Sequence, residues 1–165
     1  MAEKDLVVSG LRVSQDNIVF DMNELYQVMK KWCKINRYDL EEKAIEHEAI
    51  PEGKEEIIRW HIKREADNYI QFVIRSTIKI VGKDVDVIKK GKAVKGGISV
   101  NLEAWLDKDY DREWEESPVF RFMRDFYNRF ILAGKYKNYS KALKNDTHDL
   151  FNEVRAFLDL HIPRK

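Results

Sequence analysis

Cysteine and histidine, the side chains that most often act as nucleophiles, bases and zinc ligands, are few in this sequence and scattered. The chain has one cysteine, Cys33, and four histidines, which are His47, His61, His148 and His161. No histidine has a second one four residues away, so no helix presents a zinc-binding pair. Phosphate-binding glycine loops and nucleophile motifs are absent as well. The sequence therefore predicts no catalytic residue, no metal site and no cofactor.

Three alternating acids come closest to a metal motif. Asp107, Asp109 and Asp111 match the first ligand positions of a calcium-binding loop, which also needs a glycine for its sharp turn and a closing glutamate. Arg112 and Pro118 occupy those two positions. We therefore expect an acidic loop and no tight calcium site.

The single cysteine excludes an internal disulfide bond and is typical of a reducing compartment. Lysines flank Cys33 and could lower the pKa of its thiol, but no histidine base is evident beside it, so we expect a packing role. No apolar run is long enough to cross a bilayer. We expect a soluble, cytoplasmic protein without membrane insertion.

Period-two alternation of apolar residues organises the middle of the chain. Between Tyr69 and Val81 every second residue is apolar or small, which is typical of a strand with one buried face. Similar alternation runs through residues 38–106, with turns expected at 51–54, 66–68, 82–83 and 90–91. A register in which all apolar faces agree pairs Ile45 with Trp60, His47 with Ile58, and Trp60 with Ile74. It predicts an antiparallel five-stranded meander.

Helical spacing appears on both sides of this region. Asp21 is a suitable N-cap for a helix over residues 21–36, and residues 1–20 are expected to form an arm or short strands. Ser117 and Pro118 open a second helical region, with Gly134 as its expected end. Its apolar stripe contains Val119, Phe122, Met123, Phe126, Phe130 and Ile131. A connector over 136–144 and a last helix to about residue 160 should follow.

These elements predict one α+β domain covering residues 1–165. The expected architecture is a two-layer sandwich in which an N-terminal helix and two C-terminal helices, within 117–160, pack on one sheet face. A strongly curved sheet around a long C-terminal helix would resemble the helix-grip fold of lipid and small-ligand carriers. That alternative rests on the order of the elements alone.

The inner sheet face contains the residues that could line a ligand cavity. These candidates are His47, Trp60, Phe72 and Ala104. His47 is a titratable group among apolar neighbours, which is a feature of ligand pockets as well as of hydrogen-bonded cores. The bulky stripe of the second helical region should fill the available space, so we expect a solid core.

The outer sheet face contains the residues that could meet a partner. These candidates are Arg59, Lys63, Arg75 and Lys79. Only Tyr69 and Trp105 are expected to offer rings there, whereas RNA-binding sheets stack bases on several exposed aromatics. Nucleic acid is therefore a less favoured partner than protein.

Charge is strongly divided along the chain although the net charge is only +1. Residues 101–116 contain seven acids and two bases, a net −5, and residues 121–144 contain seven bases and one acid, a net +6. Divided charge orients a complementary partner. We therefore expect a non-enzymatic binding or adaptor domain that acts through charged surface on a protein. The alternatives are a carrier of an apolar small molecule and a weak RNA or DNA binder.

Overall fold

The computed structural model describes residues 3–87, 91–108 and 118–161. Its strands are β1 (Glu3–Phe20), β2 (Asp39–Ile50), β3 (Gly53–Glu65), β4 (Ile70–Val87) and β5 (Gly91–Lys108). Its helical segments are α1 (Met22–Ile35), α2 (Pro118–Phe126), the π-helical turn η2 (Tyr127–Leu132) and α3 (Ala133–Leu160). The predicted α+β fold is confirmed.

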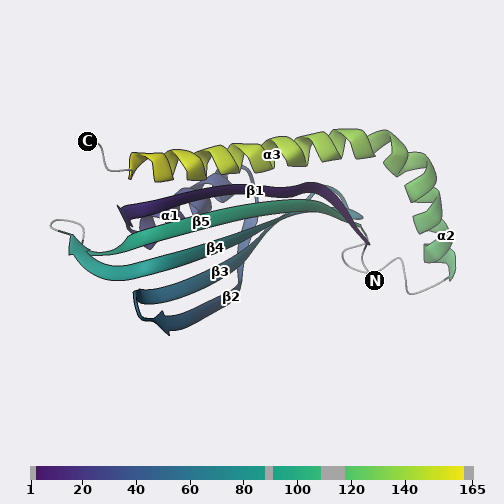
Figure 1. Ribbon diagram of the computed structural model, residues 1–165. Helices are drawn as coiled ribbons and strands as arrows, with labels where there is room; N and C mark the ends of the chain where they lie inside the picture. The colour runs from purple at the N-terminus through teal and green to yellow at the C-terminus, as the bar shows by residue number, and fades with distance from the viewer. Residues whose placement is uncertain (1–2, 88–90, 109–117, 162–165) are drawn as a thin grey trace.

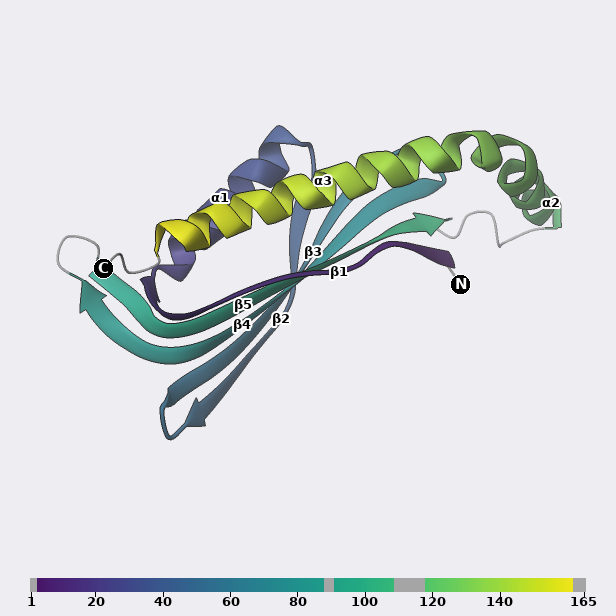
Figure 2. The same ribbon diagram turned by 45° about the horizontal axis from the view of Figure 1, so that its top comes forward.

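All five strands belong to one antiparallel sheet with the order β1-β5-β4-β3-β2. Strands β2 to β5 form a meander, and β1 adds to its far edge beside β5. Helices α1 and α3 lie side by side on one face of the curved sheet (Figures 1 and 2). The structure is thus two layers deep, with the sheet curved along one long C-terminal helix.

Strand β1 replaces the expected arm or short strands. It is 18 residues long and pairs with β5 over its whole length. The polar residues that seemed to interrupt it form β-bulges, and the register shifts between Gln15 and Ile18, where Asn17 has a φ of 55°. A bulge places one extra residue in a strand and lets pairing resume beyond it. The sequence pattern could not distinguish this bulge from a loop.

The prediction of a turn at residues 82–83 is wrong, because strand β4 continues through these residues to Val87. Gly82 pairs with Gly96 on β5, and a Cβ atom on Gly82 would lie only 2.4 Å from the carbonyl oxygen of Lys95. These glycines therefore allow two strands to approach closely, which is the other common reason for glycine inside a strand. Of the turn expected at 90–91, residue 90 lies outside the described residues.

The inner face of β3, β4 and β5 was assigned correctly, although the register was not, and on β2 a bulge between Glu42 and Ala44 places Glu42 opposite Trp60 instead of on the outer face. Trp60 pairs with Ser76 and Ile62 with Ile74, which is two residues away from the expected β3–β4 pairing. A shift of two keeps every side chain on its face, whereas a shift of one would have reversed it. The buried residues of the inner face include Trp60, Ile62, Phe72, Ile74, Ser76, Ile78, Ile80, Ile98, Val100, Leu102, Ala104 and Leu106.

Helix α3 passes through both the expected stop at Gly134 and the expected connector. A helical glycine costs about 1 kcal/mol relative to alanine. Burial of Leu143, Leu150 and Val154 against the sheet and α1 offsets that cost, since each fully buried aliphatic side chain contributes about 1.5–3 kcal/mol. Tertiary packing therefore outweighed the local stop signal.

Replacing Phe72 by alanine should lower the free energy of unfolding by about 3–5 kcal/mol, because its ring is almost fully buried on β4, the middle strand of the sheet. Urea denaturation measures this loss. Ile35→Ala is the control, since Ile35 is exposed on α1 and its truncation should change stability by no more than about 0.5 kcal/mol. Equal losses in the two variants would contradict the assignment of the core.

Candidate docking surface on α2

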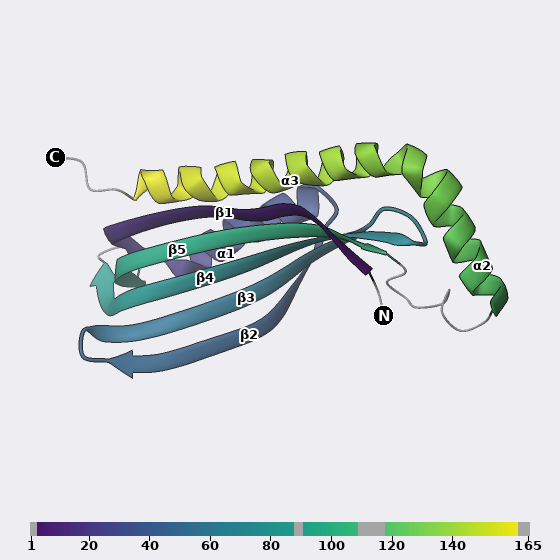
Figure 3. The ribbon, with the colours of Figure 1, turned by 45° about the vertical axis from the view of Figure 1, so that its right-hand side comes forward.

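Helix α2 does not pack on the sheet. Figures 1 and 3 show it bending away from α3 and projecting past the end of the strands. None of its residues is buried. The expectation that this helix fills the core is therefore wrong. α3 occupies the inner face instead, with Leu143, Leu150 and Leu158 fully buried along it.

One side of this projecting helix is apolar and exposed. Its members, called the α2 face below, are Val119, Phe122, Met123, Phe126 and Phe130. Phe122 is 72% exposed and Phe130 is 63% exposed. The rings of Phe126 and Phe130 touch, with centroids 4.9 Å apart. Their spacing places them on one side of a helix, so they form a continuous apolar surface. Such clusters mark interaction sites when they stay uncovered.

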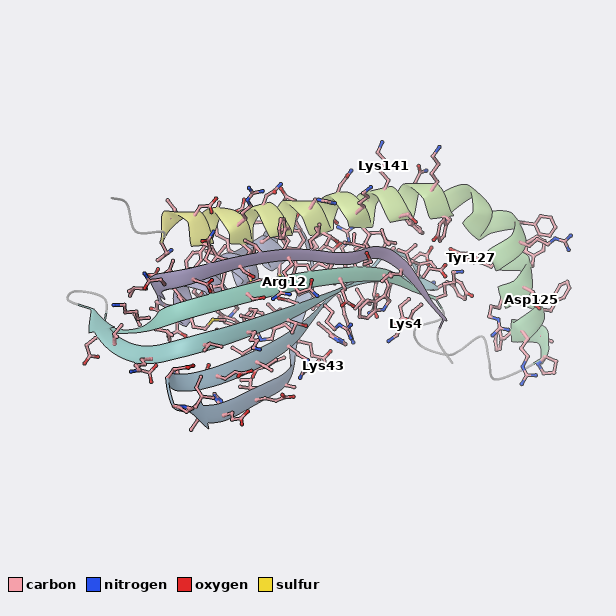
Figure 4. The ribbon with its side chains drawn as sticks, viewed as in Figure 1. Lys4, Arg12, Lys43, Asp125, Tyr127 and Lys141 are labelled. Carbon is pink, nitrogen blue, oxygen red and sulfur yellow. The ribbon has the colours of Figure 1, made fainter. Side chains whose placement is uncertain are left out.

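Basic side chains accompany the α2 face. Residues 121–144 contain seven bases, and Asp125 is their only acid. The exposed members include Arg121, Arg129, Lys135, Lys137 and Lys141. Asp125 lies near the end of α2 that continues into η2, and Figure 4 shows Lys141 pointing away from the sheet. Of the described residues at this end, those in 118–144 are therefore both rich in exposed apolar side chains and positively charged.

The bend between α3 and α2 is held by a cluster of hydrogen bonds around Asp67, in the turn between β3 and β4. The hydroxyl groups of Tyr127 and Tyr139 donate to Asp67 Oδ2 at 2.7 and 3.0 Å. The backbone N–H groups of Tyr69 and Ile70 donate to Asp67 Oδ1 at 2.7 Å each. Tyr127 lies in η2, and Figure 4 places its ring at the end of the sheet. We call Asp67, Tyr127 and Tyr139 the Asp67 cluster.

The Asp67 cluster is electrostatically favourable for an ionised carboxylate. Burial alone would raise the pKa of Asp67, but the four donated hydrogen bonds outweigh burial and lower it. Conversely, burial and the adjacent carboxylate raise the pKa values of Tyr127 and Tyr139, so both hydroxyls stay protonated as donors. The cluster thus fixes the direction in which α2 leaves the body.

The four partner-surface candidates do lie together on the outer sheet face, but each faces a glutamate. Arg59 Nη1 is 2.7 Å from Glu46, and Arg75 Nη2 is 2.5 Å from Glu103. The remaining two pairs are Lys63 with Glu41 at 3.2 Å and Lys79 with Glu55 at 3.3 Å. These pairs cancel most of the positive charge of the face. They resemble ordinary surface ion pairs, which contribute little individually.

The two rings expected on the outer face are not available for stacking. Tyr69 is buried and packs against Tyr127, with ring centroids 4.6 Å apart. Trp105 does lie on the outer face, but Lys4 and Arg75 cover it at 4.9 and 5.6 Å from its ring centroid. Trp105 is 6% exposed as a result.

Among the cavity candidates, Trp60, Phe72 and Ala104 are core residues and His47 is not. His47 is 65% exposed, and its Nδ1 lies 3.3 Å from Glu56. It shares the inner face, but the β2–β3 hairpin extends beyond the area that α1 and α3 cover (Figure 1). His47 therefore lies at the rim of the inner face and does not line an enclosed cavity.

Space beside the inner face occurs as open grooves. One of about 650 Å³ lies between the β3–β4 end of the sheet and α3, and its lining includes Phe72, Tyr139 and several charged side chains. Arg64 lies in it with its guanidinium 5.0 Å from the Phe72 ring centroid and 3.6 Å from Asp146. A second groove, of about 510 Å³, borders Cys33. Burial, followed by nearby Asp39, raises the pKa of the Cys33 thiol to about 12, so it stays protonated.

Within residues 3–87, 91–108 and 118–161, no three histidine, cysteine or acidic side chains converge as metal ligands. Asp109 and Asp111 of the predicted acidic loop lie outside these ranges. None of the described helices combines the length and the apolar character needed to cross a membrane.

The residues of the α2 face follow from helical spacing in the sequence, whereas the Asp67 cluster has no comparable sequence signal. Asp67 is a common turn residue, and a turn carboxylate that accepts from nearby N–H groups gives no unusual signal. Its tyrosine partners follow 60 and 72 positions later. Only the fold brings them together.

Asp67→Asn should destabilise the protein at neutral pH, and the difference should shrink in acid. The pKa of Asp67 is lower when folded, so its stabilisation is present above the unfolded value of 3.8 and is lost as the pH falls through the folded value. Urea denaturation at neutral pH and below 3.8 measures this. Hydrogen exchange around Tyr127 should also accelerate in the variant.

Asp159→Asn is the control for this pH dependence, because Asp159 is an exposed carboxylate on the same helix, α3. It should change stability little at either pH. A difference in the free energy of unfolding between wild type and Asp67→Asn that stayed constant with pH would contradict the electrostatic role of the Asp67 cluster.

Comparison of the sequence with known proteins finds no relative. No protein-family model matches the sequence, and neither does any curated protein.

Proposed function

We propose that this protein is a non-enzymatic docking module whose contact element is the α2 face. The proposal rests on the exposure of four large apolar side chains, Phe122, Met123 and Phe126 on the projecting helix α2 and Phe130 on the adjoining turn η2. Leaving these side chains in water forgoes about 1.5–3 kcal/mol each relative to burial. A partner that covers them recovers that free energy.

The proposed surface contains the two components of a specific interface. Phenylalanine and methionine provide anchors that gain affinity when they are desolvated. The surrounding arginine and lysine side chains guide an acidic partner into place and raise the association rate. The Asp67 cluster contributes by holding the bend, so less conformational freedom is lost on binding.

The alternatives have less support. The sheet cations once considered for a protein or nucleic-acid partner are paired with glutamates, so the sheet attracts phosphates weakly. A carrier of apolar ligands needs an apolar cavity. Trp60, Phe72 and Ala104 are packed in the core, and the grooves beside them have many charged lining residues. The α2 face is therefore a better candidate for the partner-binding surface than the outer face of the sheet.

Replacing Phe122 and Phe126 together by serine should abolish docking without unfolding the protein. Both side chains are exposed, so the thermal midpoint should change little. Gel filtration of the tagged protein in an extract of its source cells measures docking. Wild type should elute with larger assemblies or membranes, and the double variant should elute as the free protein.

Ile35→Ser combined with Leu160→Ser is the matched control, because it makes the same kind of change at two exposed helical positions on α1 and α3. This control should elute as wild type does. Identical elution of wild type and the Phe122→Ser/Phe126→Ser variant would refute docking through the α2 face.

A further inference from the structure

We infer that the α2 face binds the interfacial layer of a membrane that contains anionic lipids. This inference rests on the proposed docking function and names the surface on which α2 docks. The helix would lie parallel to the membrane, with its phenylalanine rings among the upper acyl chains and its basic side chains at the level of the phosphates. It would not cross the bilayer.

The apolar part of α2 matches what an interfacial helix requires. Such helices bury one apolar side about 5–10 Å into the boundary between headgroups and acyl chains. Phe122, Phe126 and Phe130 provide large rings on one side, and Met123 lies between them in sequence. Val119, at the start of α2, extends the same side. The apolar surface therefore runs through α2 and into η2.

The charge of this end of the molecule favours an anionic surface. Seven bases and one acid occupy residues 121–144, and Arg129, Lys135 and Lys137 are exposed beside the α2 face. Basic side chains next to an inserted apolar face are attracted to anionic headgroups.

Shape distinguishes a membrane from a groove on another protein. Figures 1 and 3 place α2 at one extreme of the molecule, beyond the ends of the strands, and Figure 2 shows the same projection from another side. A flat surface can therefore meet α2 without colliding with the sheet. A protein groove would need to cover only the apolar stripe, whereas here the exposed bases continue past it to Lys141 on α3.

Co-sedimentation of the full-length protein with lipid vesicles tests the inference. One set contains phosphatidylcholine alone, and the other contains phosphatidylcholine mixed with phosphatidylglycerol. Wild type should bind the mixed vesicles at least roughly tenfold more tightly than the neutral ones, since several bases lie near the headgroups. Added salt should weaken the binding.

A Phe122→Trp variant should shift its fluorescence to the blue on binding, which reports entry of that position into the apolar layer.

Two sets of variants separate the apolar and the charged contributions to binding. The charged contribution needs its own test because the acidic residues that precede α2 in the sequence would oppose binding to anionic lipids. Phe122→Ser/Phe126→Ser should lose binding to both kinds of vesicle. Arg129→Gln/Lys135→Gln should lose most of the preference for the mixed vesicles. Arg12→Gln/Lys43→Gln is the charge-matched control, and Figure 4 places both of its positions on the sheet, away from α2. It should bind as wild type does.

Binding to mixed vesicles that required neither phenylalanine nor the Arg129 and Lys135 charges would overturn the inference, as would no binding at all. If vesicles fail but α2-dependent association persists in the cell extract, docking stands and the membrane inference falls in favour of a protein partner. A concentration-dependent dimer abolished by Phe122→Ser/Phe126→Ser would likewise replace the membrane with a second copy of the chain.

Discussion

The carboxylate of Asp67 determines where the C-terminal helix leaves the sheet. Two tyrosines separated by 12 residues, Tyr127 in η2 and Tyr139 in α3, donate to the same oxygen of Asp67. One acceptor shared by two helical segments fixes both in position and orientation. A π-helical turn lies at this point, and such turns are a common cause of bends in otherwise regular helices. The exposure of α2 depends on this arrangement.

The body of the protein serves as the support for that bend. Long strands curve beneath α3, and the glycine pair Gly82 and Gly96 lets β4 and β5 approach closely where the sheet curves. Trp32 and Tyr38 donate hydrogen bonds to Asp149 and Asp146 of α3, which connect the N-terminal part of the chain to the long helix. Among the residues that the structure describes, the α2 face is an uncovered apolar cluster held at the end of this scaffold.

Charge is arranged differently on the two exposed regions. On the outer sheet face, antiparallel pairing brings glutamates from β2, β3 and β5 beside the cations, and the two signs neutralise each other locally. On α2 and the start of α3, bases outnumber acids and lie next to exposed phenylalanines. Apolar area provides affinity and charge provides attraction over distance. Only the second region combines the two, and for this reason the functional proposals concern α2.

The sequence by itself determined the fold class, the inner face of the sheet and the helix stripes, because all three follow from local periodicity. Register errors of two residues left the faces of β3 and β4 intact for the same reason. Tertiary structure alone decided what each apolar stripe meets. Apolar residues recur at helical spacing in both α2 and α3, yet Leu143, Leu150 and Leu158 of α3 are fully buried whereas the apolar side chains of α2 are exposed. That choice depends on the length of the sheet and on contacts between Asp67 and residues far along the chain, and neither is encoded within one turn of a helix.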